Sequence, residues 1–130
     1  MASSVTPNGI FTYLRSAILA EDPAVYVTSV RENIPASLPC VWILPTDLSE
    51  VSSAVTLDGT DRQMSATYEV QIFANTSAEA WALGDIVLTA MKELNFIRTG
   101  FSPVANIDRT IYRIVGRFRR AIGAGDMMPE

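Results

Sequence analysis

The stretch from Met64 to Glu93 places the strongest constraint on how this chain can fold. It opens with apolar and polar residues in near-strict alternation as far as Ala74, which predicts a strand with one buried face. Thr76 then stands three residues before Glu79, the spacing of a capping box at a helix start. A helix is predicted from there to about Asn95, with an inner apolar stripe of Ala80, Gly84, Val87, Leu88, Met91 and Leu94. Because the turn between them is so short, the strand and the helix must pack together, and the rest of the chain is fitted around them.

One helix and two further strands are predicted before this pair. The helix starts at Pro7, with Thr6 as its N-cap, and stops at residues 21–23. The first strand spans residues 24–31. The second, at residues 40–44, is apolar on both faces, as expected for a strand in the centre of a sheet.

The one long polar stretch of the chain, residues 46–62, follows Pro45, which we expect to end the second strand. Asp58-Gly59 within it is typical of a turn, so residues 51–57 could form half of a hairpin leading into the Met64 strand. A long excursion from a compact domain usually has a function or is disordered. We predict a projecting hairpin that meets another subunit, with a plain mobile loop as the alternative.

Two short segments and a last strand are predicted after the central helix. Residues 95–101 form a short strand or turn, residues 102–108 a connector, and residues 109–120 the last strand. Alternation in that strand places one group of side chains on a common face: Ile111, Arg113, Val115, Arg117 and Arg119. Tyr112, Ile114 and Phe118 share the other face.

The order of these elements predicts an α+β fold. Strands joined by short connections form an antiparallel sheet of about four to six strands, and both helices can cover one of its faces. Residues 1–130 then make a single domain. We expect a loose arm at residues 1–5, the projecting hairpin or loop at residues 46–62, and a loose tail at residues 121–130.

Composition favours a subunit of an assembly. Only 18% of the residues are charged, although 48% are hydrophobic, which suggests that other subunits cover part of the surface. No apolar run approaches the ~20 residues of a membrane span, and the first residues show no secretory signal. Cys40 lies in an apolar run, so we expect a buried core thiol.

Charge is unevenly distributed along the chain. Residues 1–97 carry four basic and eleven acidic side chains, whereas residues 98–120 carry six arginines and one acidic residue. Arginine binds carboxylates and phosphates in bidentate fashion, so the arginine face could meet acidic patches of a neighbouring subunit, contact nucleic acid, or simply be solvated. The net charge of −4 argues against a dedicated DNA-binding protein, and we favour subunit contact. The candidate contacts are Arg109, Arg113, Arg117, Arg119 and Arg120, opposed by Asp47, Glu50, Asp58 and Asp61.

The central helix has a second apolar flank, because Trp81, Leu83 and Ile86 lie off its inner stripe. Such a helix is either enclosed within its own domain or contacts another chain. We predict contact with another chain, and these three residues join the candidate contacts.

The sequence contains few residues or motifs that are typical of an enzyme. The absence of histidine removes the commonest general base and, with a single cysteine, argues against a transition-metal site. Asp58-Gly-Thr-Asp61 lacks the alternating ligands of an EF-hand, and Gly123-Ala-Gly125 lacks the third glycine of a nucleotide fingerprint. We therefore expect no catalytic residue, no cofactor and no metal.

Several packing motifs together resemble the tail terminator, or tail completion, proteins of tailed bacteriophages. The motifs are a strand with the residues Tyr68-Glu-Val-Gln-Ile-Phe-Ala-Asn75, Ala78-Glu-Ala80 opening a helix, Phe96-Ile-Arg-Thr-Gly-Phe101, Tyr112-Arg113 and Arg117-Phe-Arg119. The resemblance implies a small α+β subunit that forms a ring, typically hexameric. It also implies that the ring caps the tail tube, stops its polymerisation and docks onto the head connector, without catalytic residues or cofactors.

The implied partners are further copies of the chain, the tail tube protein and the connector or stopper protein of the head, while genomic DNA could pass through the ring. The implied location is the tail or neck of a virion assembled in the host cytoplasm, with no membrane contact. In a ring, one patch must complement a different patch, and the arginine face and the acidic 46–62 segment are the predicted opposites. Alternatives are another neck or head-completion adaptor, a small nucleic-acid-binding module that uses the arginines, or an enzyme of unknown type.

Overall fold

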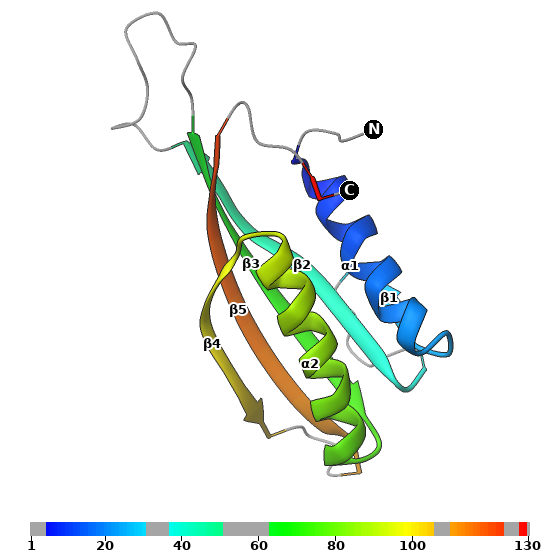
Figure 1. Ribbon diagram of the computed structural model, residues 1–130. Helices are drawn as coiled ribbons and strands as arrows, with labels where there is room; N and C mark the ends of the chain where they lie inside the picture. The colour runs from blue at the N-terminus through cyan, green and yellow to red at the C-terminus, as the bar shows by residue number, and fades with distance from the viewer. Residues whose placement is uncertain (1–4, 31–36, 51–62, 106–109, 124–127, 130) are drawn as a thin grey trace, which may run out of the picture.

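Two helices lie side by side on one face of a five-stranded sheet in the computed structural model of this protein (Figure 1). The structure describes residues 5–30, 37–50, 63–105, 110–123 and 128–129, with only the backbone at residues 48–50, 63–64 and 123. In chain order the elements are α1 (Pro7–Glu21), β1 (Tyr26–Thr28), β2 (Cys40–Glu50), β3 (Gln63–Ala74), α2 (Ser77–Glu93), β4 (Ile97–Val104) and β5 (Tyr112–Gly123). The α+β class and the single helical layer are therefore as predicted.

The strand order is β1-β2-β3-β5-β4. Every neighbouring pair is antiparallel except β1 and β2, which run parallel with Tyr26 opposite Cys40. The sheet is therefore mixed, whereas the sequence predicted an antiparallel one. Alternation predicts that a strand exists and which residues share a face, but not the direction of its neighbour.

Strand β2 is longer than predicted, because it continues through Pro45 to Glu50. The pairing with β3 shifts between Pro45 and Asp47, and such a bulge accommodates a residue that has no N–H to donate. Ladder pairing extends to Glu50 opposite Met64, so β2 and β3 are the two arms of a long hairpin. The part of the predicted hairpin at residues 51–62 lies outside the described residues.

The C-terminal part of the chain is more regular than predicted. Strand β4 occupies residues expected to be a short strand or turn and continues into the predicted connector. Strand β5 pairs with β3 along its whole length, up to Gln63 opposite Gly123, so residues 121–123 are strand and not a loose tail. Met128 is also fixed in place, because it is buried in the main core beside Gly9 of α1.

Both helices begin where the sequence predicts, and a local hydrogen bond caps each of these starts. Thr6 Oγ1 accepts from Gly9 N at 3.0 Å, and Thr76 Oγ1 accepts from Glu79 N at 3.2 Å. Glu79 Oε1 also accepts from Asn75 N at 3.4 Å, so the carboxylate reaches back as in a capping box, but to the residue before the N-cap.

The end of α2 is also set by residues that are neighbours in the sequence. Asn95 adopts a left-handed conformation with φ 63°, which asparagine tolerates better than most residues. Asn95 N donates to Lys92 O and Phe96 N donates to Met91 O, the two bonds of a Schellman motif. This turn redirects the chain from the helix into β4.

The main core lies between the helices and the sheet. It is formed by apolar side chains from both helices and from β2, β3 and β5, including Ile10, Leu14, Ile43, Tyr68, Ile72, Met91, Ile114 and Phe118. The Phe101 ring of β4 fits where two glycines leave room. A Cβ on Gly84 would lie 2.8 Å from Phe101 Cζ, and one on Gly116 would lie 2.7 Å from Phe101 Cδ2.

Candidate interaction surface

The face of the sheet opposite the helices, here called the bare face, carries no helix in the described part of the chain (Figure 1). Because directly paired residues share a face, the strand registers place the following side chains on it: Cys40, Trp42, Leu44, Asp47, Thr67, Glu69, Gln71, Phe73, Ile97, Val104, Arg113, Val115, Arg117 and Arg119. Near β2 the bare face is apolar, since Cys40, Trp42, Leu44 and Phe73 form a small buried cluster. Along β3 and β5 it is polar and basic.

Four side chains form a polar ladder across the middle of the bare face. Arg113 donates to Gln71 Oε1 from Nε at 3.1 Å and from Nη2 at 2.7 Å. Gln71 Nε2 in turn donates to Glu69 Oε2 at 3.1 Å, and Arg117 Nη2 donates to Glu69 Oε1 at 3.4 Å. The Arg113 guanidinium also lies 5.7 Å from the centre of the Phe73 ring, within cation–π range. The ladder therefore holds Arg113 in a defined position.

Exposure increases along this ladder from β3 to β5. Gln71 is 1% exposed and Glu69 is 9% exposed, whereas the Arg117 side chain is 65% exposed. Arg119 is exposed as well. An ion pair as open to water as that of Arg117 with Glu69 contributes only about 0–1 kcal/mol. Arg117 and Arg119 are thus the basic side chains of the bare face that a partner can reach.

Two exposed apolar side chains border the arginines on β4. Ile97 is 68% exposed and pairs with Arg119, while Val104 is 40% exposed and pairs with Arg113. Protein–protein interfaces are enriched in arginine and have an apolar core, so this combination of side chains is compatible with an interface.

The predicted arginine contacts divide into three groups. Arg113, Arg117 and Arg119 share the bare face, in agreement with the alternation in the sequence. Arg120 lies on the other side, where it is 9% exposed and its Nη1 donates to Leu94 O at 2.6 Å. It caps the C-terminal end of α2 and is not an exposed contact residue. Arg109 lies outside the described residues.

Of the predicted acidic contacts, the structure places only the Asp47 side chain. Asp47 is exposed, pairs with Thr67, and so shares the bare face with Arg119, the next residue across the sheet. The side chain of Glu50, and Asp58 and Asp61 as a whole, lie outside the described part of the chain.

The second flank of α2 faces α1, so Leu83, predicted as a contact with another chain, is a core residue of its own subunit. Leu83 is 2% exposed and belongs to the core, and Ile86 is half-buried between the helices. Only Trp81 is open to solvent, at 39%, with its ring 5.8 Å from that of Phe101. Because both helices cover the same face of the sheet, α2 must bury one stripe on the sheet and another on its neighbour.

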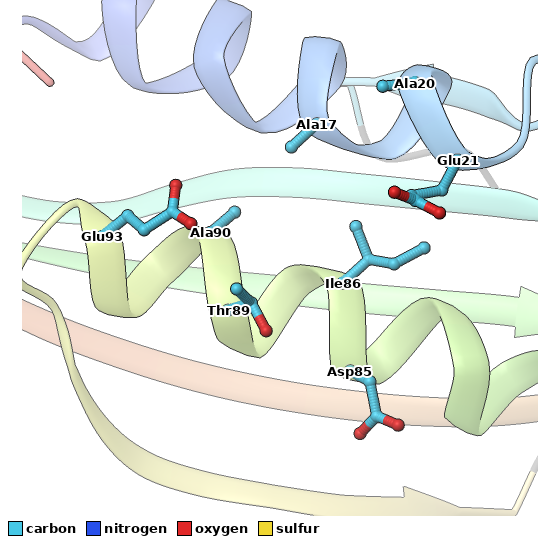
Figure 2. Close-up of a pocket in the computed structure, with 8 residues that line it drawn as sticks. All are labelled: Ala17, Ala20, Glu21, Asp85, Ile86, Thr89, Ala90 and Glu93. Atoms are coloured by element: carbon cyan, nitrogen blue, oxygen red, sulfur yellow. The ribbon is translucent and has the colours of Figure 1, made fainter. Parts of the chain in front are cut away.

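A groove of about 390 Å³, which the sequence did not predict, lies between the two helices (Figure 2). Ala17, Ala20, Ile86 and Ala90 form its apolar floor. Glu21, Asp85, Thr89 and Glu93 form its polar rim. The signal for such a hollow was the set of alanines on both helices, whose small side chains leave space where larger ones would fill it.

A hydrogen bond across the helices lies near one end of this groove. The Tyr13 hydroxyl of α1 donates to Glu93 Oε2 of α2. This bond, together with partial burial and the negative charge of Glu93, raises the pKa of Tyr13 above its ordinary value of 10.0.

The described residues include no group of three His, Cys, Asp or Glu side chains that could hold a metal ion. Within the same residues, neither helix has the length and apolar character needed to cross a membrane.

Comparison with known proteins gives a match to the fold alone. No protein-family model matches this chain, and no curated protein matches it. Among solved structures, the fold is similar to that of a chain in the virion of a native gene transfer agent (GTA) particle, with a TM-score of 0.67 and 15% sequence identity. The similarity covers 88% of this chain and 92% of that one. At this level of identity it shows that the two chains share a fold over almost their whole lengths.

Proposed function

We propose that this protein is a structural subunit of a phage-like virion, and specifically a tail terminator that assembles as a ring and caps the tail tube. The observation that carries the proposal is the similarity to a chain of a gene transfer agent virion, which extends over 88% of this chain and 92% of that one. It agrees with the independent resemblance of the sequence motifs to tail terminators.

The proposed mechanism is physical and involves no reaction. A tail tube grows because each added ring leaves an open end, and a terminator binds that end and presents a different upper face. A ring with closed symmetry requires one surface of the subunit to complement another surface of the next. The bare face suits such a contact, since the ladder of Glu69, Gln71 and Arg113 orders its centre before any partner arrives.

Assembly of the purified protein tests this proposal. We expect rings in negative-stain images of the wild-type protein, and arrest of growth when it is added to polymerising tail tube protein. The double variant Arg117→Glu/Arg119→Glu should lose both properties while its circular dichroism spectrum stays unchanged, because both side chains are exposed. Arg98→Glu is the matched control, since Arg98 is exposed but pairs with Phe118 on the helix side of the sheet.

A wild-type protein that stays monomeric at every concentration and does not bind the tube end would contradict the proposal. Another neck or head-completion adaptor would form a ring that binds the head connector but leaves tube growth unaffected.

A nucleic-acid-binding module is the second candidate, because Arg117 and Arg119 are exposed on one face. Phosphate contacts of this kind predict a DNA mobility shift that weakens steeply with salt. Arg113 supports this candidate less, since its Nε and Nη2 already bind Gln71.

A further inference from the structure

The groove between α1 and α2 has the chemistry of a site for cationic side chains. Glu21 from α1 and Asp85 from α2 are both lining residues, with the Asp85 carboxylate directed away from α1 in Figure 2, and the lining includes no basic residue among those described. Neither carboxylate forms an ion pair within the described part of the chain, whereas Glu93 accepts the Tyr13 hydrogen bond. Figure 2 shows the Glu21 carboxylate extending from α1 toward Ile86 on α2.

The dimensions and the floor of the groove suit arginine in particular. Asp85, Thr89 and Glu93 follow one another at one-turn intervals, which makes a polar edge about 12 Å long. The floor of three alanines and Ile86 offers apolar surface to the methylene stem of a long side chain, while the charged head reaches the rim. Guanidinium groups bind carboxylates with paired hydrogen bonds, which lysine cannot do.

The complementary surface is present on the same molecule, on the opposite side of the sheet. Arg117 and Arg119 are exposed on the bare face and, being two residues apart on one strand, their Cα atoms lie about 7 Å apart. That spacing fits within the acidic edge of the groove. The sheet itself separates the two surfaces within one subunit, so a subunit cannot bring its own arginines into its own groove.

We propose that the groove between α1 and α2 receives Arg117 and Arg119 from a second copy of this chain, so that the helix layer of one subunit packs on the bare face of the next. This contact is heterologous, the kind that closes into a ring when the rotation between copies allows it. The inference rests on the proposed function because it requires assembly, and it names the acidic partner of the arginines. That partner is the helix groove, in place of the acidic 46–62 segment suggested by the sequence.

Charge reversal with compensation tests this contact. The groove variant Glu21→Arg/Asp85→Arg and the face variant Arg117→Glu/Arg119→Glu should each weaken self-association at least about tenfold in sedimentation velocity, because like charges then meet. The chain carrying all four substitutions should recover most of the wild-type association, since its groove and its face are complementary again. An equimolar mixture of the two double variants should recover it for the same reason.

Two matched controls locate the effect. Asp47→Arg makes, at one site of the bare face, the same kind of acid-to-arginine change as each groove substitution, and Arg98→Glu reverses an arginine on the helix side of the sheet; each is compared with the single variants Glu21→Arg and Arg119→Glu. Neither control should weaken association as much as those single variants do. If Asp47→Arg weakens association as much as Glu21→Arg does, the groove is not the specific acidic partner and the groove proposal is wrong.

Other outcomes of these experiments would contradict the groove contact alone, or the groove contact and the ring proposal together. A groove variant that assembles like the wild type, or a fourfold variant that does not recover, would overturn the groove contact and leave the ring proposal standing. A wild-type protein that never associates would overturn both. If Glu21→Arg/Asp85→Arg does not fold, as judged by circular dichroism, Glu21→Gln/Asp85→Asn replaces it, and unchanged association of that variant would equally count against the contact.

Discussion

The two faces of the sheet bury their central residues to the same extent but by different means. On β3, Val70 and Ile72 point toward the helices and are fully buried among apolar side chains. Glu69 and Gln71 alternate with them on the bare face, where they are almost as buried yet remain polar. Apolar residues gain stability by leaving water, whereas polar residues in the same position need defined partners. Burial alone therefore does not distinguish the structural face from the candidate interface; the hydrogen bonds do.

Substitution of adjacent residues on β5 gives the largest expected difference between the faces. Phe118→Ala should lower the free energy of unfolding by about 3–5 kcal/mol, because it removes a fully buried ring from the helix side. Arg117→Ala should lower it by no more than about 1 kcal/mol, since the Arg117 side chain is 65% exposed and Glu69 keeps its hydrogen bond from Gln71. Urea denaturation measures both changes, and equal losses would show that the bare face contributes to stability as the core does.

Close packing under α2 predicts the next largest effect. A Cβ at Gly116 would lie 2.7 Å from Phe101 Cδ2 and 2.9 Å from Phe118 Cε2, so Gly116→Ala should destabilise the protein by about 1–3 kcal/mol. Gly100→Ala is the control, because a Cβ there would meet nothing within 4 Å. A thermal melt compares the two, and an unchanged melting temperature for Gly116→Ala would mean that the rings move aside at little cost.

The ladder on the bare face predicts a smaller, coupled effect. Gln71→Met removes the acceptor of Arg113 and a donor to Glu69 while preserving the length of the side chain. In a double-mutant cycle with Arg113→Met, we expect a coupling free energy of about 1 kcal/mol, the typical net value of a protein hydrogen bond. Strictly additive single effects would show that the ladder does not hold Arg113 in place.

The hydrogen bond between the helices predicts the smallest effect, which depends on pH. The Glu93 hydrogen bond raises the pKa of Tyr13 in the folded protein, so its contribution is complete below pH 10.0 and is lost as the pH rises through the higher folded value. Burial raises the pKa of Tyr68 as well, which adds a separate loss in the same alkaline range. Tyr13→Phe should therefore reduce, but not abolish, the alkaline decline in stability, and denaturation curves on either side of pH 10.0 measure it. If the alkaline decline in stability is the same in Tyr13→Phe as in the wild type, ionisation of Tyr13 does not contribute to it.

Sequence patterns that involve only a few neighbouring residues predicted most of the fold. The Thr6 and Thr76 caps begin the helices as predicted, and alternation placed Arg113, Arg117 and Arg119 on one face of the last strand. These predictions succeed because a cap needs only the next turn of chain, and a strand face follows from the period of two. The fold class followed from the order of the elements.

The candidate site depended on contacts between distant parts of the chain. Arg120 follows Arg119 directly, yet it binds Leu94 O because β5 passes beneath the end of α2. Leu83 is buried because α1 lies beside α2, a contact between segments that are far apart in the sequence. The sequence thus determined where the helices begin and which side chains share a strand face. Only the tertiary structure decided which faces meet, since that depends on how two layers fill space together and not on any local pattern.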